Sequence, residues 1–226
     1  MKILALDTAT QACSVVLGMG DRVIGRYLEL ERGHAEKLLP MVDELLAEGG
    51  ITLSALDAIA FGRGPGGFTG VRLAASVAQG LAFGANIGVV PVSDLAAVAQ
   101  RVVGLQPGVR RILVVNDARM REVYWAQFSI AVTLQPASEE HVGRAADVRL
   151  PETDGGAWVA AGRGLAAAPA LAERCRQAGA SLYADLLPRA EEILTLARPL
   201  VRLGQVLPPE QAVPVYVRDH VVTVAL

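Results

Sequence analysis

Three apolar, strand-like segments precede the first helix-like segment in this chain, and strands and helices alternate after it. The strand-like segments are short, rich in β-favouring residues and bounded by turn residues, and they cover residues 2–7, 13–20, 22–31, 56–62 and 87–92. Apolar residues at helical spacing predict helices over residues 34–50, 69–84 and 94–103. Sequential strands form an antiparallel meander, whereas strands separated by helices are joined by parallel crossovers. The order therefore predicts a mixed sheet of the ribonuclease-H type.

The opening of the chain recurs after a joint at residues 105–110. KILALDTATQACSVVLG near the N-terminus and RILVVNDARMREVYWAQF in the second half share a basic residue, an apolar strand, an acid, a polar turn and a second strand. Asp7 and Asp117 then correspond with a one-residue slip. The recurrence predicts a duplication and an α/β fold of two lobes, each a mixed sheet flanked by helices, as in the actin, heat-shock chaperone and sugar-kinase superfamily. The predicted lobes are residues 1–104 and 105–204, with residues 205–226 as a candidate addition to the first lobe.

Composition and charge argue against several classes of protein. With 52% hydrophobic and 19% charged residues, the chain can bury a core and is not intrinsically disordered. A formal charge of −2 and 4% aromatic residues argue against tight unaided binding of nucleic acid. Cys13 and Cys175 share no metal-ligand spacing, which predicts free thiols in the reducing cytoplasm. The uncharged window at residues 73–93 contains Gln, Asn, Gly and Pro, and predicts a buried helix, turn and strand rather than a membrane span.

A glycine-rich loop, GRGPGGFTG, joins the strand at residues 56–62 to the next helix. Glycines permit left-handed backbone, and backbone N–H groups before a helix can surround an anion. A phosphate-binding P-loop also ends in Lys followed by Ser or Thr, and this loop has no lysine. The spacing therefore favours a tight strand-to-helix turn, capped by Thr69, over a working phosphate site. The residues of this vestigial phosphate loop are Asp7, Gly64, Gly66, Gly67, Thr69 and Gly70.

Other residues that could carry chemistry form no recognisable constellation. Asp7, at the tip of the first strand, either handles metal and phosphate, as in that superfamily, or caps the following turn. His34, His141 and His220 form no pair at metal-ligand spacing, and no GxSxG nucleophile motif is present. The residues alone predict the geometry of a nucleotide site with little of its chemistry.

Several stretches together resemble one known family. They are ILALDTATQACSVVL, GRGPGGFTGVRLAASVAQGLA followed by VPVSDLAAVA, and VPVYVRD near the C-terminus, while NDARMREVYWAQF fits the family's second lobe. They are similar to TsaB, also called YeaZ, a bacterial family that helps to make threonylcarbamoyladenosine in tRNA. The resemblance spans nearly the whole chain. It implies a subunit that pairs with the catalytic subunit TsaD and is joined by the ATPase TsaE, while TsaC supplies threonylcarbamoyl-adenylate.

The resemblance also implies that this chain has lost a metal site. In TsaD, the strand after the glycine-loop helix leads into an H-x-x-x-H pair that binds the catalytic metal. The comparable positions here are Ser93 and Ala97, and neither side chain can act as an imidazole ligand. The resemblance therefore implies a paralogue without transferase activity, for which we expect no catalytic residue, metal or cofactor. The missing ligands also argue against the metalloprotease suggested by the older glycoprotease label.

The implied partner surface lies on the two helices of the first lobe, residues 34–48 and 69–84. We expect a homodimer in isolation that TsaD displaces, no membrane attachment, and only indirect contact with tRNA. The alternative from the residues is a small-molecule kinase or ATPase of the same superfamily, using Asp7 and the glycine loop with magnesium-ATP. The predicted interface residues are His34, Leu38, Met41, Leu45, Arg72, Ala75, Ala78, Gln79 and Ala82.

Overall fold

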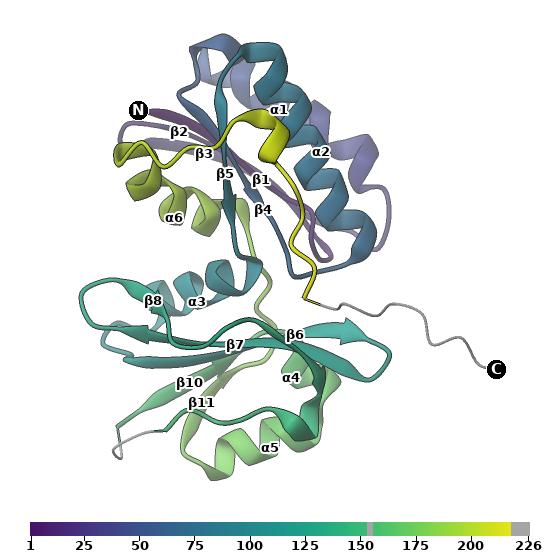
Figure 1. Cartoon of the computed structure of the whole chain (residues 1–226), viewed down its shortest axis with the longest axis vertical. Helices are drawn as coiled ribbons and strands as arrows, with labels where there is room; N and C mark the ends of the chain where they lie inside the picture. Colours follow the sequence, from purple (N-terminus) through teal and green to yellow (C-terminus); the bar gives the residue numbers. More distant parts are fainter. Residues whose placement is uncertain (153–155, 218–226) are drawn as a thin grey trace, which may run out of the picture.

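The chain forms two lobes, each built on one sheet (Figure 1). The computed structural model describes residues 1–152 and 156–217. In the first sheet the order is β3-β2-β1-β4-β5; the β1–β2 and β2–β3 pairs are antiparallel, and the β1–β4 and β4–β5 pairs are parallel. The predicted mixed sheet is therefore confirmed. Its strands are β1 (Lys2–Asp7), β2 (Ala12–Met19), β3 (Arg22–Glu29), β4 (Ala58–Gly62) and β5 (Gly88–Val92).

The second sheet repeats the first, which confirms the duplicated fold. Its order is β8-β7-β6-β10-β11, and the senses of pairing match those of the first sheet strand for strand. A further strand, β9, pairs with β7. The strands are β6 (Arg111–Arg119), β7 (Glu122–Ile130), β8 (Leu134–Pro136), β9 (His141–Arg144), β10 (Trp158–Ala161) and β11 (Ala180–Tyr183).

The position equivalent to Asp7 in the second lobe is Asn116, not Asp117 as the sequence recurrence suggested. Asp7 is buried at the end of β1, and Asn116 is buried within β6. A Cβ on Gly62 would meet Asp7, and a Cβ on Gly162 would meet Asn116, so each side chain lies against the glycine that ends or follows the neighbouring strand. Asp117 is half-exposed, and its Oδ1 accepts a hydrogen bond from the backbone N–H of Arg119. A β-bulge between Asp117 and Arg119 follows this position in the same strand.

Two helices cover one face of the first sheet, α1 (His34–Gly49) and α2 (Phe68–Ala85). The prediction for α1 is confirmed, and Gly50 ends the helix in a left-handed conformation, its N–H facing the carbonyls of Leu46 and Ala47. In α2 the buried face consists mainly of alanines, whereas Leu73, Val77 and Leu81 are only partly buried. Small side chains allow α2 to lie close to the sheet. The buried residues of α2 are Val71, Ala74, Ala75, Ala78 and Ala82.

Helix α3 (Asp94–Leu105) lies between the two sheets (Figure 1). Ser93 caps it, with Oγ accepting the N–H of Ala96 at 3.1 Å. Ala97 packs toward the first sheet, whereas Leu95, Val98 and their neighbours pack toward the second. Helices α4 (Gly164–Ala167) and α5 (Pro169–Gln177) belong to the second lobe. Within residues 1–152 and 156–217, no helix combines the length and apolarity that crossing a bilayer requires.

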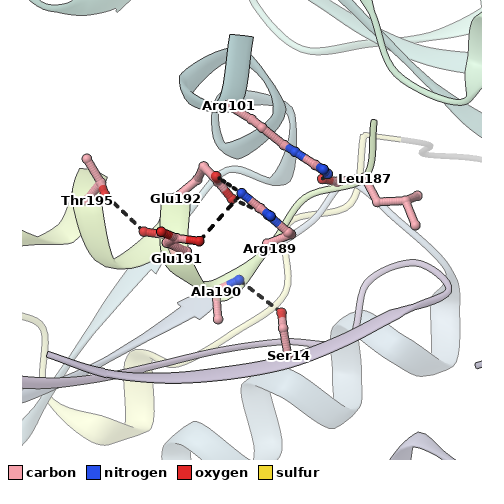
Figure 2. Close-up of polar contacts among 8 residues, drawn as sticks. All are labelled: Ser14, Arg101, Leu187, Arg189, Ala190, Glu191, Glu192 and Thr195. Carbon is pink, nitrogen blue, oxygen red and sulfur yellow. Dashed lines mark hydrogen bonds and ion pairs between the residues drawn. The ribbon is translucent and has the colours of Figure 1, made fainter. Parts of the chain in front are cut away.

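The chain returns to the first lobe through α6 (Ala190–Arg202), which lies inside the predicted second-lobe range of 105–204. Its apolar residues pack on the face of the first sheet opposite α1 and α2 (Figure 1). A side chain from another element caps the start of α6, because Ser14 Oγ on β2 accepts the N–H of Ala190 at 2.9 Å (Figure 2). Arg101 donates to the carbonyl of Leu187 just before the helix. The following segment stays on the first lobe, where Leu207 pairs with Val89 on the outer edge of β5.

Candidate functional site

Two buried carboxyl groups meet at the edge of the first sheet. Asp7 ends β1 and Asp94 follows β5, and Gly62, at the end of β4, lies between them. Asp7 Oδ1 accepts the N–H of Ala9 at 2.9 Å, and Asp94 Oδ2 accepts the N–H of Gly64 at 2.5 Å. The remaining oxygens, Asp7 Oδ2 and Asp94 Oδ1, have no other donor within the described residues. A proton kept on Asp94 would give the two acids a hydrogen bond that a pair of carboxylates cannot form.

Burial controls the protonation of both acids. Removal from water raises the pKa of Asp7 from 3.8 to about 6, although the hydrogen bond from Ala9 opposes this shift. Burial and the neighbouring charge of Asp7 raise the pKa of Asp94 well above its usual range, with Asp94 as the proton donor between them. Asp7 is thus both a cap of its turn and half of an acid pair.

A second polar cluster joins the two lobes next to this pair. The guanidinium of Arg63, just after β4, donates to both carboxylate oxygens of Glu140, at 3.0 and 3.1 Å. Glu140 precedes β9 in the second lobe and also accepts the hydroxyl of Ser93. Both charged side chains are largely buried, so a planar, bidentate ion pair holds the lobes together here.

The glycine loop is packed against the β1–β2 turn. The N–H of Gly67 donates to the carbonyl of Ala9 at 2.7 Å, and a Cβ on Gly66 would lie 2.5 Å from the same oxygen. A Cβ on Gly70 would clash with the backbone carbonyl of Thr8. The side-chain hydroxyl of Thr8 donates a hydrogen bond to the carbonyl of Gly70. These glycines permit close approach of two backbones. Because a carbonyl oxygen already occupies the Gly67 donor, the contacts favour the tight-turn interpretation over an anion site.

Thr69 does not cap the glycine-loop helix, in contrast to the prediction. Helix α2 begins one residue earlier, at Phe68, and Gly67 is its N-cap without a side-chain hydrogen bond. The carbonyl of Gly67 accepts the N–H of Val71, which starts the helical pattern. The side chain of Thr69 is therefore exposed on the first turn of the helix.

A cleft of about 850 Å³ opens between the lobes. One wall is formed by the β1–β2 turn, the start of α1 and residues 65–71 of the glycine loop and α2; the other is formed by residues 116–119 and the turn after β10. Arg163 on the second-lobe side pairs with Glu29 of β3 across the lobes at 2.8 Å. Phe68 and Tyr216 line the cleft with large exposed areas. The volume is that of a small-molecule site.

Most of the predicted interface residues lie inside the lobe and not on its surface. Six of the nine, namely Leu38, Met41, Leu45, Ala75, Ala78 and Ala82, are in the buried core between the sheet and the helices. The other three are half-buried and already engaged. His34 Nε2 is 3.0 Å from the carbonyl of Thr10, Gln79 donates to the carbonyl of Pro209, and the Arg72 guanidinium stacks on Phe68.

The outward face of α2 is exposed to solvent, unlike the predicted interface residues. Ser76, Gly80, Phe83 and Gly84 are exposed, and Phe83 is 78% accessible. A Cβ on Gly80 or Gly84 would meet no atom within 4 Å, so no contact inside the described chain calls for glycine at either position. Leu73 and Val77 border this surface. We call Leu73, Ser76, Val77, Gly80, Phe83 and Gly84 the outer α2 face.

The sequence prediction did not identify Asp94, Arg63 or Glu140. The only local signal for Asp94 was its position just after a strand, at the start of a predicted helix. Two positions were compared with metal ligands. Ser93 is a helix cap whose hydroxyl donates a hydrogen bond to Glu140, and Ala97 is a fully buried core residue. Among the described residues, no group of three or more His, Cys, Asp or Glu side chains is arranged to hold a metal.

Comparisons with known proteins agree on one family. The family model described as TsaD, tRNA N6-adenosine threonylcarbamoyltransferase, matches residues 28–210. The TsaB protein of Escherichia coli is 39% identical over 98% of this chain and 96% of its own length. TsaB of Haemophilus influenzae is 49% identical over 56% of this chain and 53% of its own. The crystal structure of YeaZ from Pseudomonas aeruginosa is 45% identical, covering 95% of this chain and 99% of that one with a TM-score of 0.87.

Proposed function

This chain belongs to the TsaB family, and from that premise we propose that it takes part in the biosynthesis of threonylcarbamoyladenosine in tRNA as a non-catalytic subunit. The names of its relatives indicate the pathway in which the chain takes part. The single observation that supports a subunit role is the outer α2 face, an exposed helix surface with two glycines that nothing in the lobe explains.

The groups that an enzyme of this fold would use to bind its substrate already form hydrogen bonds within the lobe. Asp7 caps its turn and shares a proton with Asp94. The glycine-loop donor at Gly67 is bonded to Ala9. These contacts support a structural role for the former site, and they weigh against the kinase or ATPase alternative, which needs Asp7 and that loop free for magnesium-ATP.

The outer α2 face supports pairing through helices. Glycine in a helix interior lowers the stability of the helix by about 1 kcal/mol relative to alanine. Two glycines four residues apart that no contact explains therefore destabilise the isolated lobe. Small residues at that spacing let another helix approach closely, and Phe83 beside them offers a large apolar contact. We propose that this face meets a helix of the catalytic subunit TsaD, that a second copy of the chain occupies it in isolation, and that the assembled pair recruits TsaE.

Reconstitution tests the proposed role. Purified TsaD, TsaE and TsaC should modify tRNA only when this chain is added, and full modification without it would refute a required subunit. For the surface, Gly80→Leu and Phe83→Asp should abolish co-purification with TsaD while the variants stay folded. Val132→Asp is the matched control, because Val132 is 94% exposed in the other lobe. Undiminished pairing of both α2 variants would overturn the interface while leaving the pathway assignment intact.

A further inference from the structure

Helix α2 carries a single charged residue, and no acid of the described chain pairs with it. Arg72 is the only charged side chain between Phe68 and Ala85. Its guanidinium carbon lies 3.1 Å from the centre of the Phe68 ring and 4.9 Å from that of Tyr216, and one nitrogen donates to the carbonyl of Phe68. None of the ion pairs among the described residues includes it. The two rings hold the group in place and leave an edge for a carboxylate.

An acid without a partner lies further along the same helix, at the rim of a hollow of about 480 Å³. The residues that line this α2 hollow are Gln79, Gly80, Phe83 and Glu210. Glu210 belongs to a short 3₁₀ helix (Pro209–Gln211), which is tied to α2 because Gln79 donates to the carbonyl of Pro209 at 3.2 Å. Residues 203–217 contain no other charged side chain, and no ion pair of the described chain includes Glu210.

Arg72 and the α2 hollow lie on the same flank of α2. The helix packs between α1, which covers β2 and β3, and residues 207–212 at the outer edge of β5 (Figure 1). Arg72 and Gln79 both contact residues 209–216, so their flank is the one away from α1 and its acids. Eight residues separate Arg72 from Gly80, which is about 12 Å along the axis. The cation and the acid are therefore too far apart to pair within one chain.

A second copy of the chain matches both features at once. Two identical helices that pack antiparallel about a two-fold axis exchange their ends and keep their flanks, so every contact occurs twice. With the axis between Ser76 and Val77, Arg72 of each copy reaches the α2 hollow of the other and meets Glu210. Parallel packing would instead set Arg72 beside Arg72 and Glu210 beside Glu210, and like charges across an interface repel.

The same register accounts for the two glycines of the outer α2 face. It places Leu73 of one copy over Gly80 of the other, and Thr69 over Gly84. A Cβ on either glycine would meet no atom within 4 Å, so the described chain leaves this space open. Leu73 is half-buried and Thr69 is exposed in the single chain. Small residues opposite larger ones let the two helices approach closely along their whole contact.

We propose that two copies of this chain pair through antiparallel α2 helices, with Arg72 of each copy seated in the α2 hollow of the other, on the ring of Phe83 and against Glu210. The inference rests on the self-pairing proposed above for the outer α2 face. It adds the orientation of the two copies, their register and the charged pair that fixes both. An arginine stacked on an aromatic ring and paired with a carboxylate is typical of residues that dominate the affinity of an interface.

Exchange of the two charges in the whole chain tests the pair. Arg72→Glu and Glu210→Arg should each weaken dimerisation about tenfold or more in sedimentation experiments, because symmetry creates two like-charge contacts. An equimolar mixture of the two variants should recover the affinity of the parent to within about threefold, since each mixed dimer contains two opposite-charge contacts. Arg110→Glu and Asp147→Arg, at exposed positions of the other lobe, are the controls and should leave dimerisation unchanged.

Cross-linking through cysteine tests the register. Ser76→Cys lies next to the proposed axis and should form a disulfide between copies on mild oxidation. Gly84→Cys lies on the same face but roughly 20 Å from its counterpart, so it should form none. The native Cys13 and Cys175 are buried and do not compete. A disulfide at position 84 in place of position 76 would refute the register.

The outcomes separate this inference from the proposal on which it rests. If Gly80→Leu dissociates the dimer but mixing the charge variants recovers nothing, the α2 face is the interface and the proposed register is wrong. A parent chain that stays monomeric, or a dimer that Gly80→Leu leaves intact, overturns the self-pairing itself. The role in tRNA modification is measured separately by reconstitution and does not depend on either result.

Discussion

Asp7 and Asp94 point at the same α-carbon. A Cβ atom on Gly62 would lie 2.5 Å from Oδ1 of Asp7 and 2.6 Å from Oδ1 of Asp94, so only glycine fits between the two acids. The three residues come from the ends of β1, β4 and β5 and meet because these strands are parallel neighbours. The resulting acid pair is buried at the edge of the first sheet, facing the second lobe.

Stability to unfolding should fall as the pH rises. The pKa of Asp7 is about 6 in the folded chain against 3.8 normally, and that of Asp94 is higher than usual, so the folded state keeps protons that the unfolded chain has released. The free energy of unfolding therefore declines from about pH 4 through pH 6 and further as Asp94 titrates. For Asp7 alone the change is on the order of 2–3 kcal/mol.

Urea denaturation at about pH 5 and about pH 8 measures this trend. Asp94→Asn keeps an acceptor for the N–H of Gly64 and removes one titrating group, so its profile should be flatter than that of the parent. Asp147→Asn, at an exposed acid, is the control. Parallel profiles for the parent and Asp94→Asn would contradict the proton-sharing pair.

Two glycines of α2 should respond in opposite ways to the same substitution. Gly70→Ala should destabilise the chain by about 3 kcal/mol or more, because the added Cβ would clash with the backbone of Thr8. Gly80→Ala should stabilise it by about 1 kcal/mol, since the added Cβ meets only open space on the helix. Thermal and urea unfolding of the two variants measure both effects. Equal effects would mean that the loop does not approach the β1–β2 turn as described.

Glu140 should contribute more to stability than an ordinary surface acid. Glu140→Ala leaves Arg63 largely buried without its carboxylate and removes the acceptor of the Ser93 hydroxyl, so we expect a loss of about 2–3 kcal/mol. Asp147→Ala breaks the exposed pair with Arg144 and should cost under about 0.5 kcal/mol. Chemical denaturation of the two variants gives the comparison. A loss no larger than that of the control would remove the inter-lobe ion pair as a stabilising element.

Ser14 should act as a helix cap supplied by a strand. Helix α6 has no side-chain cap of its own, and Ser14 takes that place through the N–H of Ala190 (Figure 2). Ser14→Ala leaves this buried N–H unpaired and should cost about 1–2 kcal/mol. Thr195→Ala, which removes an exposed hydroxyl on the same helix, should cost less than about 0.5 kcal/mol. Urea unfolding distinguishes the two, and equal costs would exclude capping by Ser14.

The sequence was sufficient for the framework and insufficient where distant segments meet. Strand length and alternation located all five strands of the first sheet, and the recurrence predicted the second. Periodicity alone could not rank two stripes on α2, because Leu73 and Val77 recur at the same helical spacing as the alanines that pack against the sheet. The same ambiguity placed the predicted interface on core residues. An interface must be selected from exposed residues, and exposure depends on tertiary packing.

The candidate site was harder to predict than the fold for a related reason. Asp94 meets Asp7 only because β5 lies beside β4, and Glu140 reaches Arg63 from a loop of the other lobe. No local pattern encodes either contact. The sequence recurrence was matched on its acid, Asp117, which directly follows the buried Asn116. The two residues are adjacent, but Asn116 carries a buried, unpaired amide and Asp117 a half-exposed carboxylate.

The return of α6 to the first lobe has a consequence for synthesis on the ribosome. One face of the first sheet is finished only when Ile193, Leu194 and their neighbours arrive, long after β5 has been made. Until then, Ile3, Val16 and Val90 have no cover on that side, and the nascent first lobe exposes an apolar sheet. The N-terminal lobe therefore cannot complete its folding as an autonomous early unit. A fragment that stops at residue 104 should be insoluble unless residues 190–202 are supplied in trans.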